Sequence, residues 1–302
     1  MSTTDPKRKV EKSRYIAGAY SVSNVVRSEE HIDRTFEQFL EWMNRNANDK
    51  KPIHLDKFIS YTTFDVIGEI VFSKQFGFLE QGIDIGGAIR NSLALNAYVA
   101  VAGYFRWINI YLSLIPCQHP DKLTIREINT QALAAVGAGS DAVAAGIQSF
   151  IYHMIRHPNA WARAQTEVQD ATKKGLCEDN IVSYADVQEL PYVQACVKEA
   201  LRMFGPVIPH SKEFWGEDAH EFKPDRWLKG DAAVKEKFWI PFGAGYGSCP
   251  GQSVAKVELA KMTATLVRDY NIQQVDPKQE WSWKAYFTVV PHSWPVLVEK
   301  IR

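Results

Sequence analysis

Apolar residues recur every three or four positions along most of this sequence, which is the spacing of one buried helix face. The pattern predicts helices over residues 28–51, 55–72, 124–157, 158–174, 183–189 and 191–205, and one more after residue 251. Apolar and polar residues alternate only briefly, over 295–300, so strands should be few. We therefore expect a mainly α fold with minor β structure.

The apolar run over residues 96–116 is long enough to span a membrane, but Arg106 and Asn109 interrupt it. Its content favours a buried helix or a helix that lies at a membrane surface. The N-terminal residues are polar and basic, so they predict neither a signal peptide nor a transmembrane anchor.

The predicted helix over 124–157 is unusually long and carries small residues in its middle. Gly137, Gly139 and Gly146 each lower helix stability relative to alanine, so they indicate either close helix packing or space for a flat ligand. Asp141 lies among them. Periodicity leaves two interpretations for its carboxylate, which either faces solvent or forms hydrogen bonds in a pocket.

An acidic and a basic residue share one face of the predicted helix over 191–205. Glu199 and Arg202 stand three positions apart, and a further arginine, Arg226, follows in the FKPDRW segment. Surface pairs at this spacing are common and stabilise an isolated helix by only about 0.2–0.5 kcal/mol. On spacing alone, the pair indicates no function.

Cys249 lies in the segment FGAGYGSCPG, residues 242–251, directly before a predicted helix. The glycines let the backbone approach a flat partner closely. The unpaired N–H groups and the positive dipole end of a helix N-terminus stabilise an anionic sulfur. An anionic sulfur in an apolar, aromatic-walled loop is a ligand that a haem iron can use.

Composition narrows the range of partners. Lys plus Arg and Asp plus Glu both total 35, and no long basic block occurs, so nucleic-acid binding is not expected. Aromatic residues make up 12% of the chain, which suits either a large apolar pocket or a well-filled core. The four cysteines form no CxxC pair and no zinc-site spacing with histidine, which indicates reduced thiols in a protein facing the cytosol.

Taken in order, these features resemble the cytochrome P-450 superfamily of haem-thiolate monooxygenases, and especially its fungal members of secondary metabolism. Four ordered motifs carry the resemblance. They are FxxGxxxCxG at Phe242, Gly245, Cys249 and Gly251, ExxR at Glu199 and Arg202, the meander arginine at Arg226, and AGxD at Ala138, Gly139 and Asp141. With interruptions, the resemblance extends from about residue 5 to the C-terminus.

The resemblance implies a cofactor site around the cysteine loop. Cys249 would be the axial ligand of the haem iron, and its electron density would favour O–O cleavage. Phe242 would lie against the macrocycle near the sulfur, with Gly245 and Gly251 in the same cofactor-binding loop.

The resemblance also implies roles away from the loop. Glu199, Arg202 and Arg226 would form a buried charge triad that fixes the core beneath the haem. Asp141 would lie beside the oxygen-binding groove. The family usually has a proton-delivering threonine after this acid, but the residue here is Ala142, so slow or leaky monooxygenation is expected.

Two further departures concern the cofactor contacts and the length of the chain. Gly247 occupies the position where an arginine or histidine commonly binds a haem propionate. The sequence starts where the family's third helix would begin, without the anchor and the first strands. We expect a single, incomplete P-450-like domain over 1–302, with deletions near 115–122 and 207–210 and most of the β-rich part missing.

Three functions are compatible with these residues. The first is a haem b-dependent monooxygenase that oxidises an apolar small molecule with electrons from NADPH through a flavin-containing reductase. By resemblance it would associate with the cytoplasmic side of the endoplasmic reticulum. The second is a haem-thiolate isomerase, cyclase or peroxide-using catalyst, which would not need the missing threonine. The third is a haem-free, truncated pseudoenzyme or interaction module.

Overall fold

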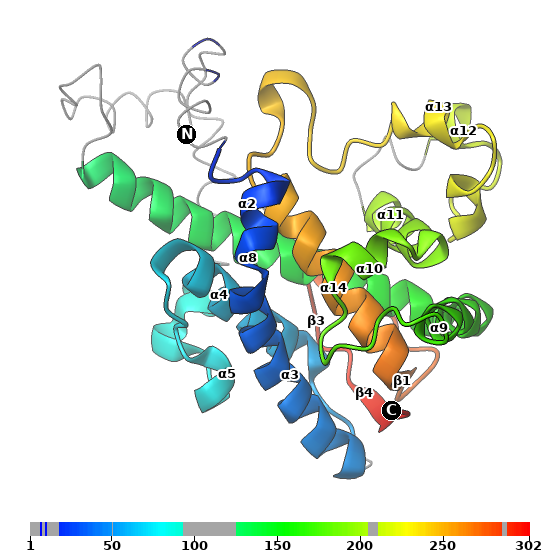
Figure 1. The fold of residues 1–302 in the computed structure, drawn as a ribbon, viewed down its shortest axis with the longest axis horizontal. Coiled ribbons are helices and arrows are strands. Elements are labelled where there is room, and N and C mark those ends of the chain that lie inside the picture. Colours follow the sequence, from blue (N-terminus) through cyan, green and yellow to red (C-terminus); the bar gives the residue numbers. More distant parts are fainter. Residues whose placement is uncertain are drawn as a thin grey trace.

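The computed structural model has a mainly helical fold, as the sequence predicts (Figure 1). It describes residues 18–49, 51–92, 125–204, 211–285 and 289–302, together with the isolated residues 7 and 10. None of the helices within these ranges is both long and apolar enough to cross a membrane. The longer helices are α3 Glu29–Asp49, α4 Leu55–Phe72, α8 Ile125–Arg156, α9 Pro158–Thr172, α11 Pro191–Phe204 and α14 Gln252–Asp269. The shorter ones are α2 Val22–Arg27, α5 Phe78–Gln81, η1 Ile85–Gly87, α10 Tyr184–Gln188, α12 Lys212–Trp215, η3 Pro224–Trp227, α13 Ala232–Glu236 and η4 Gly245–Gly247.

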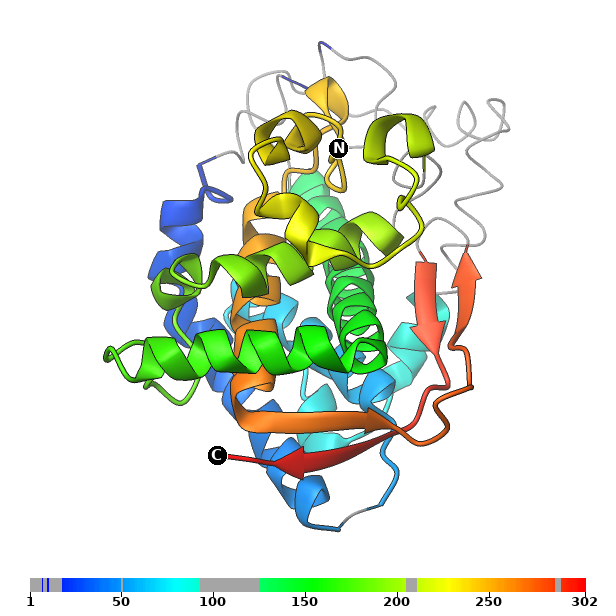
Figure 2. The ribbon, with the colours of Figure 1, turned by 90° about the vertical axis from the view of Figure 1, so that its right-hand side faces the viewer.

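Helix α8 lies at the centre of the fold, where α4, α9, α11 and α14 all pack against it (Figure 2). Two of its glycines allow this close contact. A Cβ on Gly139 would lie 3.1 Å from Ile67 Cδ1 of α4, and a Cβ on Gly146 would lie 3.0 Å from Leu259 Cδ2 of α14. At these two positions the close-packing interpretation of the small residues is therefore correct.

Most predicted helix boundaries agree with the structure. Helix α4 spans the predicted residues, Pro158 opens α9, and Ser183 caps α10, where its Oγ accepts a hydrogen bond from Asp186 N at 3.0 Å. The sequence missed α2 because its six residues are too few to show a periodic stripe. The predicted helix within 96–116 and the capping residue Thr124 lie outside the described residues.

Four short strands follow α14 in the sequence. They are β1 Tyr270–Gln274, β2 Ser282–Ala285, β3 Val289–His292 and β4 Val296–Lys300. Strand β4 confirms the predicted β element, and it pairs antiparallel with β1, while β2 pairs antiparallel with β3. Val296 of β4 also forms a bridge to Ile53, just before α4. Both views place β1 and β4 at the opposite end of the molecule from α12 and α13.

Side-chain contacts also join early and late segments of the chain. Ser293 N donates a hydrogen bond to Asp56 Oδ2 at 3.1 Å, although the two residues are 237 positions apart. The ammonium group of Lys261, on α14, is fully buried and lies 2.8 Å from Asp33 Oδ1 of α3. A buried lysine of this kind requires its acidic partner, because an unpaired charge in the interior is strongly destabilising.

Glu258 of α14 should make the stability of this fold depend on pH. Its side chain is buried, and burial raises its pKa to about 8, from an ordinary value of 4.5. Because the folded state keeps a proton that the unfolded chain releases, the free energy of unfolding should fall as the pH rises from about 4.5 to 8. The slope should reach at most about 1.4 kcal/mol per pH unit.

Urea unfolding across this pH range measures the effect, and a Glu258→Gln variant serves as the comparison. The variant should lose this part of the pH dependence, since glutamine does not titrate. An identical slope in the variant and the wild type would assign the pH dependence to other groups.

Candidate haem-thiolate site

Cys249 ends the glycine-rich loop and stands three residues before α14. Its backbone N–H donates to the Phe242 carbonyl at 2.7 Å, which closes the loop on itself. At Gly243, φ is 70°, and an added Cβ would lie 2.7 Å from the Gly247 carbonyl oxygen, so this turn requires glycine. The loop leaves Cys249 as an exposed free thiol.

The other two described cysteines differ from Cys249. Cys177 and Cys196 are also free thiols, but both are buried. Burial raises the pKa of Cys177 to about 11 and raises the pKa of Cys196 as well, so both stay protonated at neutral pH. Among the described cysteines, Cys249 is therefore the candidate for a thiolate ligand, and Cys117 lies outside the described residues.

Tyr20 is a neighbour of Cys249 that the sequence did not indicate. Burial, and then the negative charge of a Cys249 thiolate, raise the pKa of the Tyr20 phenol. The two residues lie at opposite ends of the chain, and no periodic pattern or motif connects them. Only the packing of α2 against α14 brings this part of the chain to the cysteine loop.

Glu199, Arg202 and Arg226 meet in the interior of the protein. Arg202 Nε and Nη2 donate to the two carboxylate oxygens of Glu199 at 2.8 and 2.9 Å, and Arg226 Nε donates to Glu199 Oε1 at 2.8 Å. All three side chains are at most 3% exposed. Arg226 Nη1 also donates to Asp218 Oδ1 at 3.2 Å, so two guanidinium groups face two carboxylates.

Further hydrogen bonds complete this buried charge cluster. Trp227 Nε1 and the backbone N–H of Lys223 each donate to Glu199 at 2.9 Å, and Arg202 Nη1 donates to the Ala219 carbonyl at 2.7 Å. Residues 218–227 therefore cover the face of α11 that carries Glu199. The surface-pair interpretation from helix spacing is wrong, because helical periodicity contains no information about a covering loop.

Asp141 is buried in α8, where its Oδ2 accepts a hydrogen bond from Ser92 Oγ at 2.7 Å. Of the two interpretations of its carboxylate, the hydrogen-bonding one is correct and the solvent-facing one is wrong. Ala138 and Ala142 stand one turn apart on the same helix and are exposed. Helix α8 thus presents small apolar side chains on one face while its acid points into the protein.

Open space lies beside three glycines of the cysteine loop and of α8. A Cβ added at Gly137, Gly245 or Gly247 would meet no atom within 4 Å. The exposed thiol of Cys249, in a loop whose Gly245 and Gly247 have open space beside them, fits the sulfur ligand that a haem iron takes.

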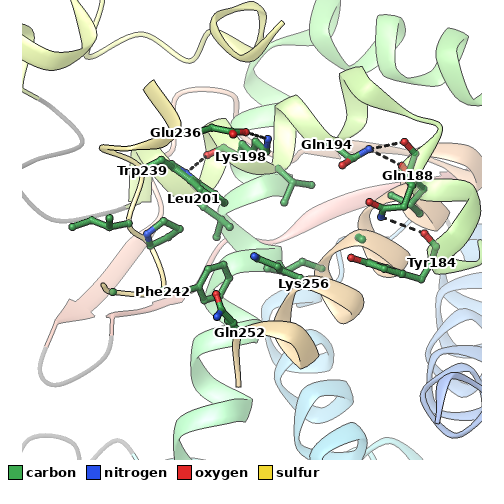
Figure 3. Close-up of a pocket in the computed structure, with 17 residues that line it drawn as sticks. Tyr184, Gln188, Gln194, Lys198, Leu201, Glu236, Trp239, Phe242, Gln252 and Lys256 are labelled. Atoms are coloured by element: carbon green, nitrogen blue, oxygen red, sulfur yellow. Dashed lines mark hydrogen bonds and ion pairs between the residues drawn. The ribbon is translucent and has the colours of Figure 1, made fainter. Parts of the chain in front are cut away.

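Phe242 faces a cleft of about 500 Å³ between the cysteine loop, α11 and α14 (Figure 3). Its ring is edge-on to Trp239 with centroids 6.4 Å apart, and the Lys256 ammonium lies 5.6 Å from the centroid of the Phe242 ring. Contact between Phe242 and a macrocycle stays a prediction.

Comparison with known proteins finds similar fungal proteins. A cytochrome P450 monooxygenase of Emericella nidulans, cicH, is 26% identical over 356 aligned positions, which cover 91% of this chain and 71% of the relative. A second, asR2 of Sarocladium schorii, is also 26% identical and is covered to 69% of its length. The alignment with cicH is longer than this 302-residue chain, so the matched region of cicH contains residues without a counterpart here.

Solved structures share the fold. The crystal structure of the cytochrome P450DA heme domain superposes with a TM-score of 0.77 at 17% sequence identity, covering 96% of this chain and 76% of that one. The family model of cytochrome P450 matches residues 108–210 and 206–294. These matches span more than half of the chain, and the protein belongs to the cytochrome P450 family.

Proposed function

We propose that this protein is a haem-dependent monooxygenase that inserts one oxygen atom into an apolar small molecule of secondary metabolism. The exposed thiol of Cys249, in a glycine-rich loop before α14, is the observation that carries the proposal. The names of the similar fungal proteins support the reaction class. The other oxygen atom of dioxygen would leave as water, with two electrons and two protons consumed.

The haem, when bound, would supply the oxygen chemistry, and the residues of this chain would hold it. Cys249 would provide the sulfur ligand, and Gly245 and Gly251 would keep the loop backbone close to the macrocycle. The buried charge cluster of Glu199, Arg202 and Arg226 would keep residues 218–227 rigid beside this loop. Asp141 accepts a hydrogen bond from Ser92, and residue 142 has no hydroxyl group. Protons would therefore reach the oxygen site through water or through the substrate.

Electrons would come from NADPH through a flavin-containing reductase, as the resemblance to the P-450 superfamily implies. By resemblance to the family, we propose that the protein associates with the cytoplasmic face of the endoplasmic reticulum.

The contacts of Asp56 with Ser293 and of Asp33 with Lys261 support one domain over residues 1–302. We also propose that, relative to other members of the family, this chain has two deletions, near 115–122 and 207–210.

If this function is correct, Ala142→Thr should raise the fraction of NADPH electrons that end in oxidised product and lower the fraction that ends in hydrogen peroxide. Position 142 is exposed and therefore has room for a hydroxyl, which could hold a proton-donating water near the oxygen site. With reductase and NADPH, the variant should release about two- to tenfold less hydrogen peroxide per NADPH consumed, since positioned proton donors contribute rate factors of at least this size. Ala138→Thr, one turn away, is the matched control, and equal peroxide release from all three proteins would contradict the proposed proton route.

The missing hydroxyl at Ala142 also favours a second candidate, a haem-thiolate isomerase or cyclase that needs no electrons. The two functions differ in whether they need electrons from NADPH. Product formation from a panel of apolar substrates should depend on reductase and NADPH for the monooxygenase, whereas an isomerase would turn over without either. If purified protein takes up no haem even when haemin is added, both enzymatic functions are wrong and a haem-free interaction module remains.

A further inference from the structure

The cleft next to Phe242 is open to the surface, and of its lining only Phe242 and Gly243 belong to the cysteine loop. It is lined by α11 and α14 on its long sides, by the segment 239–243 at one end and by α10 at the other (Figure 3). Its volume of about 500 Å³ lies within the range of small-molecule sites in proteins. A molecule with two fused rings would fit inside it.

The cleft lining combines apolar and aromatic side chains with polar ones, among them Gln188, Gln194 and Gln252. Its lining includes Val197 and Leu201 of α11, Leu259 of α14, and the rings of Trp239 and Phe242. The indole N–H of Trp239 donates to the Lys198 carbonyl at 3.1 Å, which holds this ring in place. Such walls favour an aromatic ligand, because ring faces and edges pack well together.

The charges of the lining residues sum to one positive charge. Lys198 forms an ion pair with Glu236, so these two cancel. Lys256 is exposed, and no acidic side chain in the described part of the chain forms an ion pair with it. Its ammonium group lies over the Phe242 ring. In Figure 3 the Lys256 side chain lies between Phe242 and Tyr184 and faces the cleft.

We propose that this cleft binds a small aromatic anion, a carboxylate or sulfonate, with its rings against Trp239 and Phe242 and its charge on Lys256. The Phe242 carbonyl accepts the hydrogen bond from Cys249 N, so the bound anion would contact the residue that closes the cysteine loop. The inference goes beyond the proposed function. Binding requires neither haem nor a reductase.

Isothermal titration calorimetry with naphthalene-2-carboxylate as the probe tests the proposal, with the uncharged 2-naphthylmethanol as its comparison. Wild-type protein should bind the carboxylate about fivefold more tightly than the alcohol, the size expected for a partly exposed ion pair. Lys256→Gln should remove that preference and leave binding of the alcohol unchanged. Lys212→Gln, which changes an exposed lysine outside the cleft, should behave as the wild type.

A second variant tests the location independently. Ala260→Leu extends a side chain of α14 into the cleft and should weaken binding of both probes about tenfold or more. Lys256 is exposed, so Lys256→Gln should keep the fold and the test remains decisive if Ala260→Leu does not fold. The proposal would be overturned if Lys256→Gln kept the preference for the carboxylate over the alcohol, or if the wild type bound neither probe at millimolar concentration. Neither result would change haem uptake, so the proposed function is tested separately.

Discussion

A Cys249→Ala variant, reconstituted with haem and reduced under carbon monoxide, should lack the absorbance band that is diagnostic of a thiolate ligand. The wild type should show the band. The effect should be complete, because Cys249 is the one exposed thiol among the described cysteines, and the buried Cys177 and Cys196 stay protonated.

Tyr246→Ala is the matched control for this experiment. Tyr246 lies in the same loop and is 64% exposed, so its removal changes the loop composition but leaves the sulfur in place. The control should retain the band. A band of normal intensity in Cys249→Ala would show that another residue binds the iron, and the site would have to be placed elsewhere.

Glu199→Ala should lower the free energy of unfolding by about 3–5 kcal/mol, because it leaves two buried guanidinium groups without their shared carboxylate. The loss should appear as a lower urea midpoint with an unchanged slope, since the surface exposed on unfolding stays the same. Glu199→Gln, which keeps the side-chain shape, should be destabilised as well and is more certain to fold.

An exposed ion pair provides the comparison for Glu199. Asp170, in the last turn of α9, forms an exposed ion pair with Lys173, the residue that follows this helix. The two residues have the same spacing as the buried pair Glu199 and Arg202. Asp170→Ala should leave the urea midpoint almost unchanged, because water and salt screen exposed charges. A loss below about 1 kcal/mol for Glu199→Ala would mean that the cluster opens to solvent.

Local patterns were sufficient to predict the long helices and the short, capped helix α10. A stripe of apolar residues, a cap such as Ser183 and a stop such as Pro158 are all contained in a short window of sequence, and they set the bounds of α4, α9 and α10. The short strands β1 to β3 and the helix α2 were missed because they offer too few residues for a period to emerge. Their formation depends on partners elsewhere in the chain.

The candidate site was predictable to the extent that its residues occur in ordered motifs. Glu199, Arg202, Arg226 and Cys249 were identified by their order along the chain, although neither composition nor periodicity indicated that the first three would be buried together. Ser92 and Tyr20 were not identified, since each is brought to its partner by packing between distant segments. Asp218 was not identified because it lies in an irregular loop, eight positions from Arg226, without a motif of its own.

The hydrogen bond between Ser293 N and Asp56 has a consequence for how the protein is made. Its two partners are 237 positions apart, so the ribosome must finish almost the whole chain before α4 can meet the segment beside β4. Until then the part of α3 that packs against β4 stays uncovered, although α3 and α4 can already pack against each other and α4 against α8. Chaperones that protect this part of α3 during translation should therefore raise the expression yield.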